Sequence, residues 1–363
     1  YDIMVSVHYL VKSLRSEALS DTIDSETLSN LAQSSALLLG ALVAASTLVF
    51  TLIKVWINER TTTATEEGLI TDRINAAVAS LGAEKTQKNA ETGNEFTRPN
   101  IEVRIGAILA LERIAKMNAD VHIQIMEILT AYLRENAPIK DQENSELPRQ
   151  DIQLALTVIG RRPTKRITLE RQQEFSLDLR RCDFSMADFS EANFDHAQFE
   201  QSRFVEAELS YAQLNNADLS DAQLDYAGLF LAQLNNADLG LAQLNYADLK
   251  FAQLNNADLK FARLDNADLS YTRLDNADLG LAQLNSVIFF EKASLRGAGV
   301  RDIDFRTITG PYSSVTQEQI NTMFGDGSVI LPAHITRPAH WPCETLNDRS
   351  FIDQWRAWQE TLD

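Results

Sequence analysis

The sequence predicts a mixed fold in three parts: a helix that crosses a membrane, a domain of α-helices and a long repeat solenoid. Three patterns predict it: an apolar run at 36–53, apolar spacing of three and four between residues 64 and 160, and a large apolar residue at every fifth position from Leu179. The chain of 363 residues carries a net charge of −18, of which −11 belongs to residues 175–305. Because binding to phosphates needs clustered Lys and Arg, this charge argues against a nucleic-acid-binding protein.

The first part is a membrane segment, residues 1–60, with a long stretch that has no ionisable side chain. About 20 apolar residues at a rise of ~1.5 Å cross the hydrocarbon layer. We therefore expect a spanning helix at about 34–57, against the alternative of a buried helix in a soluble protein. Its bilayer and interface residues are expected to be Leu37, Leu42, Val49, Leu52 and Trp56.

The charges around this run predict its orientation. Lys54 and Arg60 follow the run and acidic residues precede it, so the positive-inside rule places all later residues in the cytoplasm. Residues 1–14 are apolar but too short to span alone. They are either the end of an earlier spanning helix or an amphipathic helix on the membrane surface.

The second part is an α-helical domain at 61–162. Apolar spacing predicts helices over residues 70–81, 101–114, 123–133 and 151–159. Asp120 is the expected N-cap of the third helix, and the polar residues 84–100 are expected to form a loop. Residues 163–174 are expected to form a basic linker that covers the acidic segment after it or contacts anionic lipid headgroups.

The third part, residues 175–305, is the repeat. From Leu179 a large apolar residue recurs every five positions to Phe289, and after one inserted residue the pattern resumes at 295 and ends at Phe305, which makes 26 repeats. A step of five residues scatters these side chains around a helix axis by about 140° each, so no helical core forms. In an extended chain an odd period alternates faces, so the chain must turn once per repeat to point every pair inward.

A small residue, usually Ala, lies two positions before almost every large one, and both are expected to face the interior. The expected structural core includes Leu179, Phe184, Phe189, Phe194, Leu214, Leu219, Leu234, Leu254, Leu274, Ala217, Ala237 and Ala257. Cys182 takes an Ala position, so we expect an inert core thiol and no nucleophile.

Three blocks in the helical part carry a family resemblance: ITDRINAAVASLG at 70–82, the segment 100–138 and DIQLALTVIGRR at 151–162. Followed by the repeats, they resemble bacterial membrane-anchored pentapeptide-repeat proteins. The resemblance implies a right-handed quadrilateral β-helix with twenty residues per coil, located at the bacterial inner (cytoplasmic) membrane. The block VRIGAILALERIA also resembles an armadillo or HEAT helix, whose stacking forms binding surfaces.

The segment 306–363 loses the repeat and is expected to cap the solenoid. Thr316 and Gln319 form a capping-box pattern that opens a short helix. Phe351, Trp355 and Trp358 indicate a last amphipathic helix.

Two patterns on the outside of the repeat are candidates for an interaction surface. The position before the central residue alternates between Asp and mostly Gln, and one column is Asp218, Asp238, Asp258 and Asp278. Two apolar series at twenty-residue spacing are Tyr211, Leu231, Phe251 and Tyr271, and Leu241, Phe261 and Leu281. Exposed apolar surface usually marks a partner site, although packing within each column is an equal alternative.

No pattern indicates an enzyme, a cofactor or a small-molecule substrate. We find no nucleophile with a base and no phosphate loop; His122 is expected to be a core or surface residue, and His334, His340 and Cys343 lack a fourth metal ligand. The expected function is that of a structural or protein-interaction protein, tethered to the lipid bilayer, with an unknown protein partner or self-association.

Two alternatives stay open. Some family members with acidic rods resemble B-DNA and bind type II topoisomerases, which implies a DNA-mimic inhibitor. Residues 211–285 carry a net −6 over about 18 Å, or one charge per ~3 Å, whereas B-DNA carries one per ~1.7 Å. The other alternative is a sensor or effector component of a membrane stress or defence system.

Overall fold

The structure is a computed structural model that describes residues 9, 12, 25–89, 94–140, 147–288, 290–308 and 314–362. It divides into two units, Tyr1–Asp72 and Arg73–Asp363, which are described separately. The helical region, the repeat and the C-terminal segment thus share one unit. Except for Tyr9 and Lys12, the expected helix at 1–14 lies outside the described residues.

The first unit is dominated by helix α2 (Ser25–Leu81), which continues into the second unit. Its stretch Leu39–Asn58 has a mean hydropathy of 1.9 and is 0% buried, so it is long and apolar enough to cross a membrane. The expected membrane residues Leu37, Leu42, Val49, Leu52 and Trp56 are all exposed.

The helical region of the second unit contains α3 (Ile101–Met117), α4 (His122–Asn136), α5 (Gln150–Gly160) and the end of α2. Helices α3, α4 and α5 pack on one another around side chains that water does not reach, such as Ile108, Leu111, Ile125, Leu129 and Ile159. The expected helices are therefore present. The N-cap of α4 is Val121, however, and not Asp120, because the chain turns one residue later than the capping pattern suggests.

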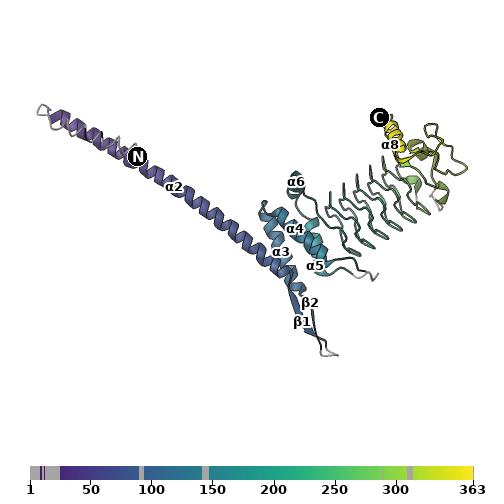
Figure 1. Cartoon of the computed structure of the whole chain (residues 1–363), viewed down its shortest axis with the longest axis horizontal. Helices are drawn as coiled ribbons and strands as arrows, with labels where there is room; N and C mark the ends of the chain where they lie inside the picture. Colours follow the sequence, from purple (N-terminus) through teal and green to yellow (C-terminus); the bar gives the residue numbers. More distant parts are fainter. Residues whose placement is uncertain are drawn as a thin grey trace. The chain divides into compact units, whose positions relative to one another are not determined.

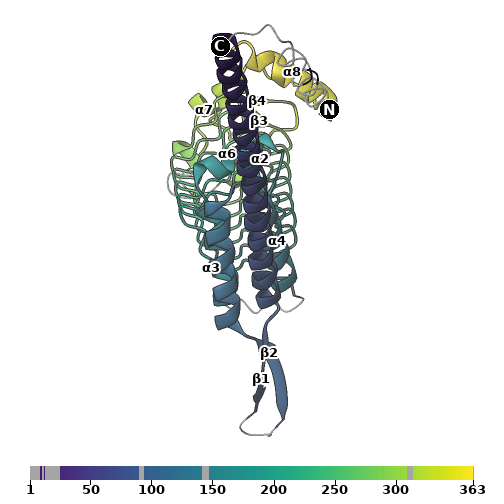
Figure 2. The same ribbon diagram turned by 90° about the vertical axis from the view of Figure 1, so that its left-hand side faces the viewer.

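Two segments of this region differ from the prediction. The expected loop at 84–100 forms an antiparallel hairpin of β1 (Glu84–Lys88) and β2 (Glu95–Pro99), with Lys88 opposite Glu95 (Figure 2). Its strands are mostly exposed and charged, so they carry no apolar alternation that would reveal them.

The expected basic linker at 163–174 is instead largely helix α6 (Thr164–Gln172). Its buried residues are Ile167 and Glu170, so one of its two buried side chains is charged. A single apolar residue does not produce the periodic pattern that sequence analysis recognises.

The repeat forms stacked coils of twenty residues, as the resemblance implies (Figure 1). Parallel bridges join residues twenty apart, for example Gln213 to Gln233 and Asp218 to Asp238. Each repeat closes with a β-turn, in which the N–H of Ala217 donates to the carbonyl of Leu214 at 3.1 Å. The twelve residues expected in the core are each at most 1% exposed.

One inserted residue near position 289 changes the bridge spacing from 20 to 21, as between Arg273 and Ser294. Phe290 is fully buried and its ring lies 6.2 Å from that of Phe305. Phe289, which the five-residue spacing assigns to the core, lies outside the described residues.

The C-terminal segment lies against the last coils (Figure 1). After the short 3-10 turns Phe290–Lys292 and Phe305–Thr307, it contains α7 (Gln317–Thr322), β4 (Phe324–Gly325) and α8 (Asp348–Gln359). Strand β4 pairs in parallel with β3 (Gly299–Val300), which lies in the last coil. The capping box at Thr316 and Gln319 is present, as predicted.

Candidate interaction surface

The N-terminal end of the solenoid is closed by the helical region. Within the stack an N–H donates to the carbonyl 21 residues earlier, as Gln213 does to Ala192 at 2.9 Å, but the first coil has no earlier coil. The helical region supplies the missing acceptors in three pairs: Asp183 to the Ala137 carbonyl (2.7 Å), Asp188 to the Gln153 side chain (3.0 Å) and Asn193 to the Gly160 carbonyl (2.9 Å). A β-carbon on Gly160 would come within 2.6 Å of Ala192, so glycine permits this close approach.

The C-terminal end is closed in the same way, here by donors that reach the last carbonyls. Side chains and backbone of the C-terminal segment both take part. The pairs are Gln319 to the carbonyls of Phe290 (2.8 Å) and Ala293 (3.0 Å), Phe324 to Ala298 (2.8 Å), Ile330 to Ile303 (2.9 Å) and Trp355 to Gly297 (2.8 Å). With both ends covered, the sides are the part of the solenoid that is left for a partner.

Each coil presents four faces, which we number by their central residues: face 1 (Leu214), face 2 (Leu219), face 3 (Leu224) and face 4 (Leu229). Residues twenty apart repeat on the same face. Faces 2 and 4 each combine a column of acidic residues with one of the two apolar series.

The acidic columns carry part of their own counter-charge. Lys250 lies 3.1 Å from Asp248 and 3.4 Å from Asp268 on face 4. On face 2, Lys260 lies 2.9 Å from Asp278 and 3.4 Å from Asp258. Burial acts to lower the pKa of Lys260, but these carboxylates outweigh it and raise that pKa. Asp238 is not paired in this way, and burial together with Asp258 and Asp218 raises its pKa.

The apolar series on face 4 forms a continuous column, which we call the face-4 stripe: Tyr211, Leu231, Phe251 and Tyr271. Phe230 joins it, with ring centroids 5.7 Å from Tyr211 and 5.9 Å from Phe251. Phe251 stacks on Tyr271 at 4.9 Å. Tyr211, Phe251 and Tyr271 nevertheless remain 50%, 43% and 54% exposed. The rings of the face-4 stripe thus pack on one another within their column and are still about half exposed to solvent.

The corresponding series on face 2, which we call the face-2 stripe, is Leu241, Phe261 and Leu281. Leu241 and Phe261 are 57% and 46% exposed, and Leu281 is half-buried. Each stripe borders an acidic column on its own face, so both surfaces offer apolar contact beside negative charge.

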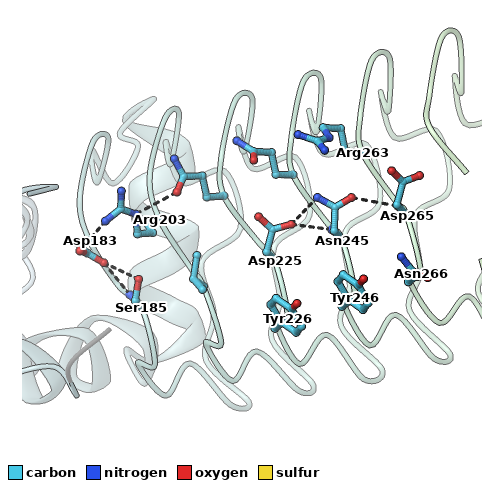
Figure 3. Close-up of a pocket in the computed structure, with 13 residues that line it drawn as sticks. Asp183, Ser185, Arg203, Asp225, Tyr226, Asn245, Tyr246, Arg263, Asp265 and Asn266 are labelled. Carbon is cyan, nitrogen blue, oxygen red and sulfur yellow. Dashed lines mark hydrogen bonds and ion pairs between the residues drawn. The ribbon is translucent and has the colours of Figure 1, made fainter. Parts of the chain in front are cut away.

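Face 3 contains a groove that the sequence analysis did not single out (Figure 3). It has a volume of about 690 Å³, and Tyr226 and Tyr246 line it. Their rings stack at 4.8 Å with an interplanar angle of 2°. Tyr226 and Tyr246 are twenty residues apart in the sequence, but their column continues with the polar residue Asn266. They therefore do not form an apolar series of the kind found on faces 2 and 4.

The potentially reactive side chains His122 and Cys182 are both buried in the fold. His122 is buried with Nε2 2.7 Å from Glu170, and Arg162 donates to the same carboxylate at 2.8 Å. Burial alone would raise the pKa of Glu170, but these hydrogen bonds lower it. Cys182 is fully buried, and burial raises its pKa to about 12. Such a thiol is a poor nucleophile.

The C-terminal histidines are not assembled into a metal site in the part of the chain that the structure describes. The Nε2 of His340 lies 2.8 Å from the Met323 carbonyl, and its ring stacks on Trp358 at 4.9 Å. Cys343 is an exposed free thiol.

A solenoid of four-sided coils with one turn per five residues defines a class of repeat protein. Residues 182–221, 202–240, 232–260 and 262–299 match the family model described as Pentapeptide repeats (8 copies). The match covers most of the repeat segment and less than half of the whole chain, so it shows that this segment consists of pentapeptide repeats. None of the curated proteins matches the chain.

Solved structures of other pentapeptide-repeat proteins are similar to parts of the chain. A thylakoid-lumen protein of Arabidopsis thaliana is 27% identical, with 29% of this chain and 66% of that chain covered and a TM-score of 0.21. HetL of Nostoc sp. strain PCC 7120, involved in heterocyst differentiation regulation, is 22% identical over 46% and 90%, with a TM-score of 0.15. QnrB1, a plasmid-mediated fluoroquinolone resistance protein, is 13% identical over 50% and 99%, with a TM-score of 0.26.

Proposed function

We propose that this protein is a non-enzymatic interaction protein, tethered to the bacterial inner membrane, which presents its acidic rod in the cytoplasm. The apolar, unburied stretch Leu39–Asn58 supports the tether. Lys54 and Arg60 at the end of this stretch support the orientation. The partner is another protein or a second copy of the chain.

The observation that carries the interaction role is the exposure of aromatic rings along the face-4 stripe. Three of its rings are about half exposed, although each already contacts a neighbour in its column. Together with the face-2 stripe they add apolar area to a surface that is otherwise polar. Apolar patches bordered by polar residues are typical of protein–protein contacts.

The test is crosslinking and affinity purification from membranes, with the intact protein and a variant in which Leu231, Phe251, Leu241 and Phe261 are changed to Asn. All four have φ between 56 and 62°, a backbone region that Asn tolerates well, so the variant should keep the fold. Loss of a defined partner or of self-association would support the proposal. Recovery of the same neighbours with both proteins would contradict it.

The orientation can be tested with the two native cysteines. Cys343 is exposed and Cys182 is buried, so a thiol reagent that cannot cross membranes reports on Cys343 alone. We expect labelling in lysed cells and none in intact cells, with Cys343→Ser as the unlabelled control. Labelling in intact cells would place the C-terminal segment outside and overturn the cytoplasmic orientation.

The DNA-mimic role is the second candidate, and the acidic columns of faces 2 and 4 favour it. The lysines at 250 and 260 weaken it, because each neutralises carboxylates within those columns. We therefore expect purified protein to leave gyrase supercoiling unchanged. Inhibition that Asp238→Lys relieves would instead support the DNA-mimic role.

A further inference from the structure

The groove on face 3 is lined mostly by polar residues, and none of its lining residues belongs to either apolar stripe. It crosses five coils. In each coil the residue directly before the central residue of face 3 lines the groove, and these residues are Asp183, Arg203, Gln223, Gln243 and Arg263. We propose that this groove binds an extended, uncharged oligosaccharide. The inference stands independently of the protein partner proposed above.

One wall of the groove is a rigid aromatic platform. Tyr226 and Tyr246 are 56% and 52% exposed while their rings stack in parallel (Figure 3). The next residue in their column is Asn266, so no third ring covers the outer face of Tyr246. The outer face of Tyr246 and the exposed parts of both rings offer apolar surface against which a sugar ring can pack.

The floor of the groove is held in place by its own hydrogen bonds. Asn245 donates to Asp225 at 2.7 Å and accepts from the backbone N–H of Asp265 at 3.2 Å. This ladder fixes the side chains before any ligand arrives, which lowers the entropy cost of binding.

Other polar groups in the groove are still available. Within the described residues, the side chains of Gln243 and Arg263 and the hydroxyls of Tyr226 and Tyr246 make no hydrogen bond or ion pair with another residue. The Gln243 amide offers two N–H donors and an acceptor, each tyrosine hydroxyl offers one donor and an acceptor, and the Arg263 guanidinium only donates. This mixture matches the hydroxyl groups of a sugar, which also donate and accept.

The charge of the groove points to a neutral ligand. It contains three carboxylates and two guanidinium groups, one pair of which, Asp183 and Arg203, lies 3.5 Å apart. The carboxylates would repel a polyanion such as nucleic acid. A polycation would bind better on faces 2 and 4, where the acidic columns lie.

The repeat distance separates a sugar chain from a peptide. Successive coils present equivalent side chains every ~4.8 Å. In an extended β-1,4-linked chain alternate hexoses turn the same face to one side, so that face recurs at about every second coil. An extended peptide directs side chains to one face about every 6.7 Å, so it falls out of register with the coils.

The experiment measures binding of cellohexaose and chitohexaose to the full chain in lipid nanodiscs, because sugar-based detergents would compete. Saturation-transfer NMR detects the contact and calorimetry gives the affinity. Tyr246→Asn removes half of the platform, and Asn suits its φ of 60°. Tyr271→Asn is the matched control, since it removes a tyrosine with φ of 57° from the equivalent position on face 4.

We expect at least one hexasaccharide to bind, with Kd raised at least tenfold by Tyr246→Asn and less than twofold by Tyr271→Asn. Circular dichroism checks that both variants keep the fold. The proposal is overturned if neither sugar binds at millimolar concentration or if the two variants weaken binding equally. Binding of an extended Ser/Asn hexapeptide that Tyr246→Asn abolishes, without sugar binding, would assign the groove to peptides instead.

Discussion

At the residue scale, the solenoid depends on a backbone conformation that most L-residues avoid. From Arg181 to Ser286 every fifth residue has φ between 55 and 62°. Asn occupies several of these positions, such as Asn216 and Asn236, and tolerates the left-handed region well. Leu, Phe and Tyr do not tolerate the left-handed conformation as Asn does. Each such residue in the apolar stripes therefore adds a backbone free-energy cost that Asn at the same position would reduce.

This cost leads to a prediction for Leu241, which is 57% exposed with φ of 62°. Leu241→Asn should stabilise the protein by about 1 kcal/mol, or raise Tm by about 2–4 °C, because Asn relieves the strain and little buried apolar area is lost. Thermal denaturation followed by circular dichroism measures it. The reciprocal change Asn236→Leu, at φ of 58°, should lower Tm by a similar amount. Equal shifts in one direction would show that φ does not control stability at these positions.

At the element scale, the five-residue period was enough to predict which side chains face inward, because geometry leaves no other way to bury them together. The period says nothing about closure after four turns, so the twenty-residue coil required the family resemblance. The hairpin at 84–99 and helix α6 escaped prediction for another reason: neither buries a periodic apolar face. Helix α6 buries Glu170 beside Arg162, a contact between residues that sequence patterns assign to solvent.

The coil itself gives a second prediction. Ala237 is 1% exposed inside the rod, so Ala237→Phe overpacks it and should cost about 3 kcal/mol or more, with loss of the β-type circular dichroism. Asp238→Asn should leave the spectrum and Tm nearly unchanged, since an amide oxygen can still accept from the N–H of Gly240. Equal tolerance of both substitutions would contradict the assignment of inward and outward positions.

The raised pKa of Asp238 gives the sign of its pH dependence. Its charged form is disfavoured in the folded state, so the contribution of Asp238 to stability rises as pH falls through that pKa. Asp238→Asn should remove this contribution, so between pH 7 and pH 4 the Tm of the variant should fall further than the Tm of the unchanged protein.

The contact between α6 and the helical region gives a further prediction. Glu170→Gln leaves Arg162 and His122 buried without their carboxylate, so it should cost about 3–5 kcal/mol at pH 7. The pKa of Glu170 is lowered, so its contribution is present above the unfolded-state pKa and is lost as the solution is acidified. The variant should therefore show a smaller loss of stability between pH 6 and pH 3 in urea denaturation.

Glu112→Gln is the control for this prediction. The pKa of Glu112 is also lowered, but its partners Arg161 and Lys116 are each 48% exposed, so its loss should cost about 1 kcal/mol or less. Equal losses in the two variants would show that burial of the ion pair does not matter.

At the scale of the whole molecule, both ends of the solenoid are closed by chain segments that lack the repeat. Because the backbone N–H groups of one coil donate both to the earlier and to the later coil, each end of the stack would otherwise present unpaired N–H groups and unpaired carbonyls, which invites end-to-end pairing. The helical region satisfies three donors and the C-terminal segment satisfies five carbonyls. The two segments thus do the same physical task, although they share no structure.

Removing one closure should therefore change the association state of the protein. Deletion of residues 316–363 exposes the last carbonyls, including those of Ala298 and Ile303, and should convert the purified chain into concentration-dependent oligomers. Size-exclusion chromatography with light scattering measures this. Gln319→Leu is the milder companion, because it removes two of the bonds and keeps the chain in place, so it should lower Tm without causing association. If the deleted chain keeps the fold by circular dichroism and the association state of the intact protein, then pairing at the exposed end is not what the C-terminal segment prevents.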